Sequence, residues 1–507
     1  MSNAAQVIWD RGCSHADQVA LRGAREPWTY GHLRERAAAV ASRLRAARVG
    51  PGDRVLLVAP SVPEFAGAYF GILAAGAIAV TANTMSTRRE LEYLGSDAKV
   101  AMVAGWHEIQ PAPAEAAAAL GVPYWPLADE LADFAGTSAA EPHPSADDDT
   151  AAILYTSGTT GRPKGAQLTH GNLIACASIF TDVLEVGPAD RLGTALPLFH
   201  VFGQAVVMGT ALRTGASLTL LACFDAGELL GLIRRDKLTV VLGVPTMWNA
   251  LLHSPVEPDP GQFASLRLAA SGGASLPAEI LRAFEERFGC VILEGYGLTE
   301  TTGAATFNGL RRRRKAACAG IALPRCEIEV RDDDGGPVRA GEVGEVYVRG
   351  PVVMKGYWNR PDATAEALAD GWLRTGDLGT LDGDGDLRIV DRKKDLVIRG
   401  GYNVYPREVE EVLYEHPDIV EVAVIGVPDE HYGEEVAAVL ALRPGAVLDP
   451  AALRAWAKER LSSYKVPRLF LRVDELPKGP TGKILKRAID RDAIRALAGG
   501  LAARSGR

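Results

Sequence analysis

Residues 155–165 read Tyr155-Thr156-Ser157-Gly158-Thr159-Thr160-Gly161-Arg162-Pro163-Lys164-Gly165, in which small hydroxyl residues and glycines precede two cations. Glycines allow backbone N–H groups to approach an anion closely, because no Cβ intervenes. Hydroxyl groups donate hydrogen bonds, and the arginine and the lysine neutralise charge. The apolar run 151–155 predicts a short buried strand. The stretch therefore indicates a phosphate-binding loop at the end of a strand.

This loop differs from the P-loop of nucleotide-binding proteins. Lys164 follows Gly161 by three positions, and no Gly-Lys-Ser/Thr sequence occurs. A surface loop rich in Gly, Ser and Thr is the alternative interpretation for any single stretch of this kind. The rest of the chain has to decide between the two.

Length and composition favour a large globular protein with at least two domains. The chain has 507 residues, of which 47% are hydrophobic, and its formal net charge is −8. An acidic balance disfavours a nucleic-acid partner, since basic surfaces neutralise phosphate backbones. The six cysteines form no CxxC pair, which favours reduced thiols in the cytoplasm over a zinc site.

Neither a secretory signal nor a membrane span is expected. The N-terminus lacks a basic segment followed by an apolar run. The most apolar stretch, 65–80, is short for a membrane span and is interrupted by Gly67, Gly71 and Gly76. A buried helix leading into a strand is the better interpretation.

Alternating strands and helices in the first 300 residues predict a parallel α/β fold. Leu33, Ala37, Val40 and Leu44 have helical spacing, and Pro63 is placed to open a second helix. Strands are expected over 55–58, 77–81, 100–104, 191–198, 217–221, 239–243, 266–270 and 291–293. Residues 110–149 are expected to be a solvated connection with one helix over 114–120.

The pattern of expected secondary structure changes twice in the second half of the chain. From Glu327 onward, short strands and Gly/Asp-rich turns predict antiparallel structure that forms a small barrel. The last ~110 residues predict a separate small domain. Its helices start at Pro406 and after the capping residue Asp449.

Six short motifs, each ambiguous alone, occur in one order along nearly the whole chain. They are 155–165, 294–302 (Glu-Gly-Tyr-Gly-Leu-Thr-Glu-Thr-Thr), 374–377 (Arg-Thr-Gly-Asp), 391–395 (Asp-Arg-Lys-Lys-Asp), 400–406 (Gly-Gly-Tyr-Asn-Val-Tyr-Pro) and 477–483 (Pro-Lys-Gly-Pro-Thr-Gly-Lys). Together they resemble the adenylate-forming superfamily, and within it fatty-acyl-CoA and related acyl-CoA ligases.

The resemblance implies an α/β fold with two domains. A large N-terminal adenylation domain, residues 1–393, would consist of stacked α/β layers and a small β-barrel subdomain at 327–393. A small mobile C-terminal α+β domain, residues 394–507, would follow a hinge at Lys394.

The resemblance also implies an ATP site. Mg²⁺ would be held by Thr156 and Glu300, since magnesium prefers hard oxygen ligands. Tyr296 would stack on adenine, Asp377 would accept hydrogen bonds from the ribose, and Arg392 would reach the ribose or a phosphate. The full set of nucleotide-binding residues implied is Thr156, Ser157, Gly158, Thr159, Thr160, Lys164, Gly273, Ala274, Glu294, Gly295, Tyr296, Gly297, Leu298, Thr299, Asp377, Ile389, Arg392 and Lys483.

The resemblance implies that the small domain takes part in both half-reactions. Lys483 would bridge the acyl carboxylate and the α-phosphate, which neutralises charge on both reactants. Gly400, Gly401 and Tyr402 would line the path of coenzyme A in the second half-reaction. The implied catalytic residues are Lys483, Thr156, Glu300, His200 and Arg392.

The acid is expected to be hydrophobic and to carry one carboxylate. Amino-acid-activating relatives have an Asp where this chain has His200, and no Arg or Lys occurs among the implied pocket residues. These residues are His200, Phe202, Gly203, Met208, Val244, Gly272, Gly273, Thr302 and Gly303.

Two stretches depart from the family pattern. The basic run 311–315 is expected to be a solvated loop, and Arg325 stands where a small residue is usual; both are expected near the pocket wall. Residues 382–386 mimic a calcium loop, but Lys393 occupies the position of the bidentate glutamate, which argues against calcium.

Three hypotheses follow. The first is an ATP-dependent acyl-CoA ligase that uses Mg²⁺ and CoA. The second keeps adenylation but hands the acyl group to a carrier protein or a separate partner enzyme. The third, a non-enzymatic relative, is disfavoured because Glu300, Asp377, Arg392 and Lys483 are all present. A monomer or a homodimer is expected.

Overall fold

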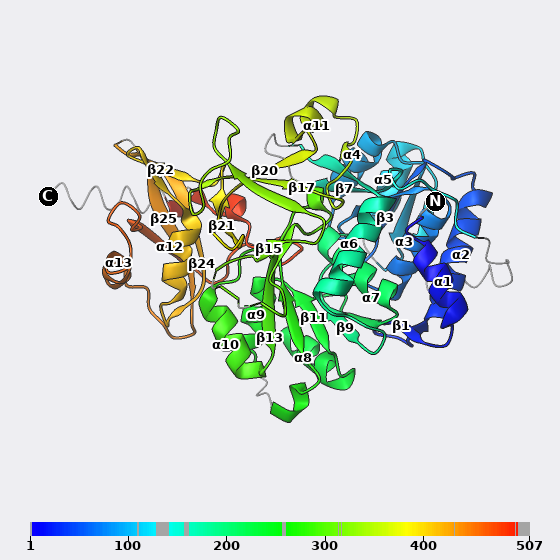
Figure 1. Ribbon diagram of the computed structural model, residues 1–507, viewed down its shortest axis with the longest axis horizontal. Coiled ribbons are helices and arrows are strands. Elements are labelled where there is room, and N and C mark those ends of the chain that lie inside the picture. Colours follow the sequence, from blue (N-terminus) through cyan, green and yellow to red (C-terminus); the bar gives the residue numbers. More distant parts are fainter. Residues whose placement is uncertain are drawn as a thin grey trace.

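A computed structural model gives the structure of the chain. It describes residues 3–108, 111–127, 141–156, 162–255, 260–312, 314–315, 317–429, 431–491 and 493–494. Figure 1 shows a large body, coloured blue to yellow along the chain, and a smaller orange and red part beside it.

A seven-stranded sheet contains the strand that leads into the phosphate loop. Its order is β18-β8-β7-β4-β3-β5-β6. The strands are β3 (Arg54–Val58), β4 (Ile78–Ala82), β5 (Met102–Trp106), β6 (Tyr124–Leu127), β7 (Thr150–Thr156), β8 (Lys164–Thr169) and β18 (Gly356–Tyr357), and the helices that alternate with them are α3 (Pro63–Ala74), α4 (Arg88–Ala98) and α5 (Ala112–Leu120). The ladders from β7 to β6 are parallel, as expected.

The expectation for 110–149 was incomplete, because β6 follows the predicted helix. Pro126 fits within this strand since β6 is at the sheet edge, where a missing N–H breaks no ladder. At the other side of the sheet, β7 and β8 are antiparallel, and Thr156 pairs with Lys164. The phosphate loop is therefore the connection between two paired strands.

A nine-stranded sheet, of order β15-β14-β13-β12-β11-β9-β10-β1-β2, completes the large body. Its strands are β1 (Val19–Arg22), β2 (Trp28–Thr29), β9 (Arg191–Thr194), β10 (Ser217–Leu220), β11 (Val240–Gly243), β12 (Leu268–Ser271), β13 (Val291–Tyr296), β14 (Thr306–Phe307) and β15 (Ile321–Ala322). Its helical segments are α1 (Gln6–Ser14), α2 (Tyr30–Ala46), α6 (His170–Val183), η2 (Phe202–Met208), α7 (Gly209–Thr214), α8 (Ala226–Arg235), α9 (Pro245–Leu252), η3 (Pro260–Phe263), α10 (Ala278–Phe288) and η4 (Thr299–Thr301). The six strands from β1 to β13 are parallel.

The strand expected over 191–198 ends at Thr194. The side chain of Thr194 accepts a hydrogen bond from the Leu196 N–H at 3.0 Å, and Pro197 has no N–H to donate to a ladder. The chain therefore leaves the sheet before His200.

Residues 327–392 contain an antiparallel sheet, as predicted, although β18 within this range joins the seven-stranded sheet. Its strands are β16 (Glu327–Arg331), β17 (Gly344–Arg349), β19 (Leu368–Ala369), β20 (Trp372–Leu381) and β21 (Leu387–Arg392), and α11 (Pro361–Ala367) precedes β19. The order is β16-β17-β20-β19, with β21 paired to β20. Within the described chain no ladder joins β16 to β21, so the strand order is open and the prediction of a small barrel is wrong.

The C-terminal part has a sheet of its own, of order β23-β22-β25-β24 with β26 beside β25. Its elements are β22 (Val397–Arg399), β23 (Tyr402–Val404), α12 (Pro406–Tyr414), β24 (Ile419–Asp429), β25 (Gly433–Leu442), α13 (Pro450–Lys458), β26 (Leu469–Val473) and η5 (Lys486–Ala488). Asp449 caps α13 through the N–H groups of Ala451 and Ala452, as predicted.

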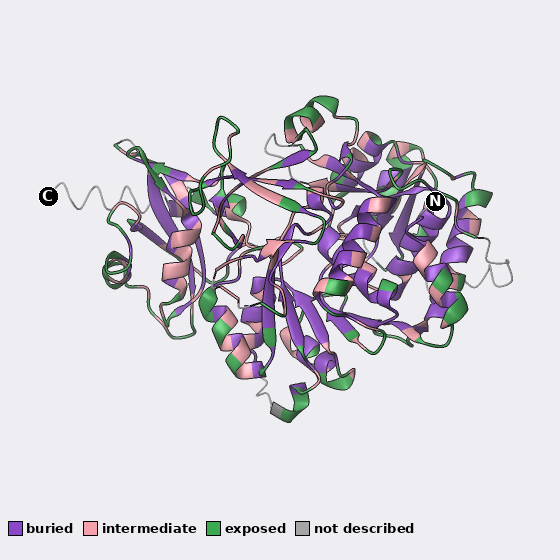
Figure 2. Ribbon diagram, viewed as in Figure 1, coloured by how far each residue is buried: buried purple, intermediate pink, exposed green. Residues whose placement is uncertain are grey.

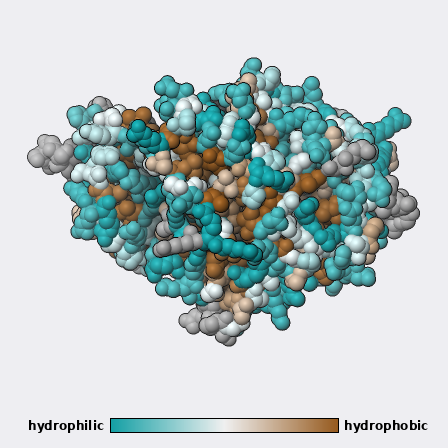
Figure 3. All heavy atoms as spheres, in the orientation of Figure 1, coloured by the Kyte–Doolittle hydropathy of each residue, from teal (hydrophilic) through white to brown (hydrophobic). Residues whose placement is uncertain are grey.

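The largest apolar clusters of the two bodies are separate. Leu57 of β3 and Leu218 of β10 are fully buried in one core that spans both large sheets. Val424 of β24 and Leu453 of α13 belong to a core within the C-terminal part. Figure 2 shows the buried strands between more exposed helices, and Figure 3 shows hydrophilic residues around the rim of this face. Of the helices that the structure describes, none has the length and apolar character to cross a membrane.

Candidate active site

The predicted site loops follow neighbouring parallel strands. Strands β9, β11, β12 and β13 are adjacent in the nine-stranded sheet, and the loops after them contain His200, Val244, Gly273 and Thr299. The carboxyl ends of parallel strands meet at one edge of a sheet, which is where such sheets bind ligands. The order of strands therefore brings together motifs that are about 100 residues apart.

The predicted magnesium ligands lie together. Glu300 Oε1 accepts hydrogen bonds from Thr156 Oγ1 at 3.3 Å and from the Tyr357 hydroxyl at 2.9 Å. Lys164 Nζ lies 5.3 Å from the centre of the Tyr357 ring. A fixed carboxylate and a hydroxyl are hard oxygen donors that suit Mg²⁺. Residues 157–161, and with them the predicted Ser157, Gly158, Thr159 and Thr160, lie outside the described residues.

The residues predicted for adenine (Tyr296) and for the ribose (Asp377 and Arg392) form a second cluster. The Tyr296 hydroxyl donates to Asp377 Oδ2 at 2.7 Å, and Arg392 Nε lies 3.2 Å from Asp377 Oδ1. Burial raises the pKa of Asp377, against the opposing effect of Arg392. The β20–β21 ladder explains this arrangement, because Asp377 and Arg392 are cross-strand partners.

Lys483 extends from the C-terminal part to the loop after β12. A methyl group at Gly273 would lie 2.7 Å from Lys483 Cε and 3.2 Å from Nζ. Burial, together with the nearby Arg392, lowers the pKa of Lys483 to about 8. The lysine is therefore desolvated and held close to the same charged groups as the ribose cluster.

His200 is neutral over the physiological range of pH. Burial, with a smaller contribution from Lys483, lowers its pKa to about 3. Its Nδ1 accepts the Phe202 N–H at 3.3 Å, which leaves the other ring nitrogen as the proton carrier. His200 can therefore donate a hydrogen bond without adding charge.

Most of the predicted acyl residues are apolar and closely packed. A methyl group at Gly272 would lie 3.1 Å from the Phe202 ring, and one at Gly303 would lie 3.0 Å from Val206 Cγ2. Met208 and Val244 are buried. A methyl group at Gly203 would lie 2.6 Å from the Pro197 carbonyl oxygen, and Thr302 donates to the Val352 carbonyl oxygen at 2.6 Å. Gly203 and Thr302 thus have clear packing roles.

The residues before the metal motif have packing roles as well. Glu294 is buried and accepts the Leu276 N–H at 3.1 Å, and burial raises its pKa to about 7. Methyl groups at Gly295 and Gly297 would meet Phe307 and Ala304 at 2.5 and 2.3 Å. Four predicted nucleotide residues remain. Ala274 follows β12, Leu298 and Thr299 follow β13, and Ile389 is on β21.

The residues predicted for the hinge and for CoA lie apart from Lys483. Lys394 is exposed in the turn between β21 and β22. Gly401 has no atom within 4 Å of an added methyl group, and Tyr402 is 62% exposed. The β22–β23 hairpin therefore faces solvent in this arrangement.

The expectation that the basic run and Arg325 lie at the pocket wall is wrong. Arg311 pairs with Glu185 and Arg314 with Glu285, while Arg325 is exposed in a surface hollow that Arg213 also lines. These acids lie outside the site, so the run is a surface segment held by ion pairs.

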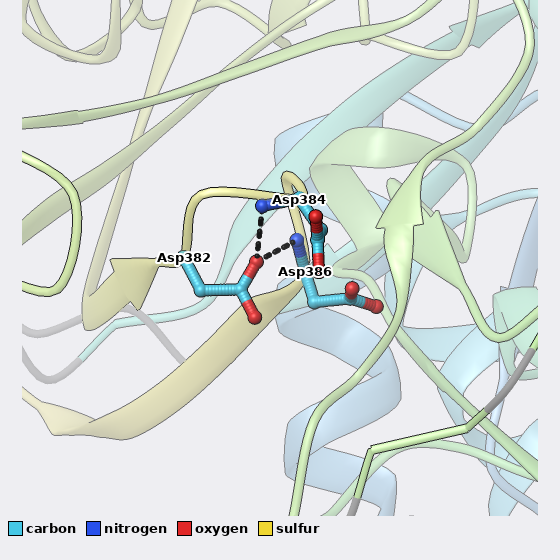
Figure 4. Close-up of side chains that lie close together, drawn as sticks. All are labelled: Asp382, Asp384 and Asp386. Atoms are coloured by element: carbon cyan, nitrogen blue, oxygen red, sulfur yellow. Dashed lines mark hydrogen bonds between the residues drawn. The ribbon is translucent and has the colours of Figure 1, made fainter.

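Lys315 occupies the calcium-like loop. Figure 4 shows Asp382, Asp384 and Asp386 around one point, with the backbone N–H groups of Asp384 and Asp386 directed at Asp382. The Lys315 Nζ lies 2.5, 2.7 and 3.0 Å from oxygens of these three carboxylates. Among the described residues this is the one group of three acids able to hold a metal, and the Lys315 ammonium group already pairs with all three.

Tyr357, Thr246 and Asn249 were missed by sequence reasoning. Tyr357 bonds Glu300, Thr246 Oγ1 donates to the Gly482 carbonyl oxygen at 2.7 Å, and Asn249 Nδ2 donates to the Val420 carbonyl oxygen at 3.0 Å. These contacts join residues 57, 236 and 171 positions apart, and no local pattern marks them.

Two family models match this chain, one in the large body and one in the C-terminal part. Residues 9–358 match the AMP-binding enzyme family, and residues 408–483 match the AMP-binding enzyme C-terminal domain. The chain belongs to the AMP-binding enzymes. A long-chain-fatty-acid–CoA ligase of Bacillus subtilis (strain 168) is 36% identical over 95% of this chain and 93% of its own length.

Further members of the family are similarly close. A feruloyl-CoA synthase of an Amycolatopsis species is 39% identical over 93% of this chain and 95% of its own. The structure of ATP-bound MatB from Rhodopseudomonas palustris has a TM-score of 0.91 at 36% identity, covering 98% of this chain and 100% of the other. These comparisons confirm the predicted family and fold class, and with them an AMP-forming acyl-CoA synthetase that uses ATP, Mg²⁺ and CoA.

Proposed function

We propose that this AMP-binding enzyme activates a hydrophobic acid with a single carboxylate and transfers it to CoA in two steps. The carboxylate oxygen attacks the α-phosphorus of ATP, and the bond to pyrophosphate breaks to give acyl-AMP. The CoA sulfur, having lost its proton to solvent, then attacks the acyl carbon, and AMP leaves. The observation that carries this proposal is the position of Lys483 against Gly273, between the apolar residues and the Asp377–Arg392 pair.

Each residue then has a role that its surroundings support. Lys483 brings positive charge to both reactants of the first step. Glu300 and Thr156 would hold Mg²⁺, which neutralises phosphate charge when bound, and Lys164 is close enough to assist. Asp377 offers acceptors to the ribose, and Tyr296 lies beside it.

The acid's tail is assigned to the apolar space around Phe202 and Gly272. Those two residues, with Val206 and Gly303, offer carbon atoms and no charged group to an acyl chain. A second carboxylate or an ammonium group buried there would lack a partner, which costs several kcal/mol. This supports a monocarboxylic, non-amino acid.

The acceptor is assigned to the β22–β23 hairpin. Gly401 leaves room for a thin chain, and Tyr402 and Ile398 are exposed on the same hairpin. We assign residues 1–393 and 394–507 to two domains that pivot at Lys394, so that the hairpin reaches the site in the second step. A carrier protein or a partner enzyme as acceptor is the alternative. A monomer or homodimer and a cytoplasmic location complete the proposal; the six free cysteines suit the location.

A two-stage assay tests the function. Pyrophosphate release is measured with ATP, Mg²⁺ and a panel of fatty, aromatic, dicarboxylic and amino acids. CoA consumption is then measured with the acids that respond. We expect release with hydrophobic monocarboxylic acids and CoA consumption without added protein. Release only with dicarboxylic or amino acids contradicts the substrate class, and release without CoA consumption favours the carrier-protein alternative.

A further inference from the structure

Helix α9 presents two side chains that hold the C-terminal part by its backbone. The Thr246 hydroxyl donates to the carbonyl oxygen of Gly482 at 2.7 Å, and the Asn249 amide donates to that of Val420 at 3.0 Å. The two residues are three positions apart, so they share one face of the helix. In Figure 1, α9 lies at the border between the large body and the C-terminal part.

The contact at Thr246 acts directly next to the catalytic lysine. Gly482 precedes Lys483, and its φ of +79° is in the region that favours glycine. A methyl group at Gly482 would lie 3.0 Å from Thr246 Oγ1 and 3.2 Å from Val244 Cγ2. Glycine therefore allows the close approach that the hydrogen bond requires.

The loop that carries Lys483 is already shaped by its own backbone. The Gly482 N–H donates to the Gly479 carbonyl oxygen at 2.9 Å, and the Gly479 N–H donates to that of Lys483 at 2.7 Å. A turn closed in this way moves as a unit. Its position relative to Gly273 then depends on where the unit is attached, and Thr246 is such an attachment.

The same contact belongs to one arrangement of the two bodies. With Gly482 bound to Thr246, Lys483 reaches Gly273, whereas Gly401 and Tyr402 on the β22–β23 hairpin face solvent. Lys483 and the hairpin cannot both be at the site without movement of the C-terminal part. The α9 contacts are therefore available to the first step and broken in the second.

We propose that Thr246 is a positioning residue that orients Lys483 for acyl-adenylate formation and takes no part in thioester formation. Asn249 supports the same arrangement from one turn further along α9. This inference rests on the proposed function, because it assigns the two half-reactions to Lys483 and to the hairpin.

The test compares Thr246→Val with Thr246→Ser. Valine keeps the shape and removes the donor, whereas serine keeps the donor. We measure acid-dependent pyrophosphate release and, separately, thioester formation from synthetic acyl-AMP and CoA. Thr246→Val should lower kcat for release roughly tenfold, as expected for one lost hydrogen bond. The KM for ATP and the rate from acyl-AMP should stay within about twofold of wild type. Thr246→Ser should restore most of the loss.

Two further variants separate positioning from folding. Thr181→Val removes a hydroxyl that donates to the Ala177 carbonyl oxygen at 2.8 Å within α6, and it should leave both half-reactions unchanged. Asn249→Leu should reproduce the selective loss of release. Equal loss of both half-reactions, no loss of either, or failure of serine to rescue would overturn the inference. Failure of the proposed function appears instead in the wild-type enzyme, as absence of release with every acid.

Discussion

Lys483 and Gly273, 210 positions apart in the chain, are so close that a methyl group at Gly273 would lie 2.7 Å from Cε of the lysine. Gly273 also has a φ of +82°, which disfavours any residue with a Cβ. This contact joins the loop after β12 to the C-terminal loop. A side chain at position 273 of the large body would therefore displace Lys483 of the C-terminal part.

Gly273→Ala should therefore impair adenylation by displacing Lys483. We expect acid-dependent pyrophosphate release to fall tenfold or more, and thioester formation from synthetic acyl-AMP to fall less. Gly289→Ala is the matched control, because Gly289 has a φ of +62° and no atom within 4 Å of an added methyl group. Alanine is disfavoured there too by the positive φ, but it makes no contact with the lysine. Equal loss of both half-reactions in Gly273→Ala would contradict displacement of the lysine.

The lowered pKa of Lys483 predicts a pH limit on the first step. A lysine is charged below its pKa, and burial brings that pKa to about 8 in the free enzyme. The value of kcat/KM for pyrophosphate release should therefore fall as pH rises through 8, approaching roughly tenfold per unit. In the complex with ATP, the corresponding fall in kcat (the alkaline limb of the pH profile) should occur at higher pH, because the negative charge of ATP favours the charged lysine.

Lys483→Arg provides the control for this limb. Arginine keeps its charge throughout this range, so the variant should be slower and should lack the fall above pH 8. A fall of the same midpoint in Lys483→Arg would assign the limb to another group.

Phe202 should limit the size of the acid. Its ring lies 3.1 Å from the position of a methyl group at Gly272, in the space assigned to the acyl tail. Phe202→Leu and Phe202→Ala should shift the preference for chain length towards longer or bulkier acids, with the larger shift in alanine. Relative kcat/KM values across an acid series measure this, with the KM for ATP as the reference. A uniform fall for all acids would indicate a packing role alone.

Several residues that the motifs predicted for the site lie together in the structure, and each motif is a local sequence with one proposed chemical task. Thr156 and Glu300 were paired as metal ligands from separate motifs, and the structure brings them within hydrogen-bonding distance. Asp377 and Arg392 came from two further motifs and are cross-strand partners. Helix starts were equally predictable at Pro63, Pro406 and Asp449, since capping depends on neighbouring residues.

The errors and omissions concern pairings between distant residues. Arg325 was expected at the pocket and is exposed, in a surface hollow lined by residues from 147–148, 169–178 and 351–355 that are distant from it in sequence. The sequence argued against calcium because Lys393 occupies the last position of the calcium-like loop. In the structure the cation that pairs with this loop is Lys315, 67 residues from Asp382. Thr246 and Tyr357 escaped notice for the same reason.

Removal of Lys315 should convert its acidic cluster into a weak calcium site. Asp382, Asp384 and Asp386 offer oxygens within 4.8 Å of one another, and without the ammonium group they repel. Lys315→Met should lower the melting temperature, and millimolar calcium should raise it again in the variant but not in wild type, since calcium accepts flexible oxygen ligands. Lys393→Met is the control, because Lys393 pairs with Asp333 at 2.7 Å, outside the cluster, and its loss leaves the ion pairs of Lys315 in place. A calcium response of equal size in both variants would show that the ion acts elsewhere.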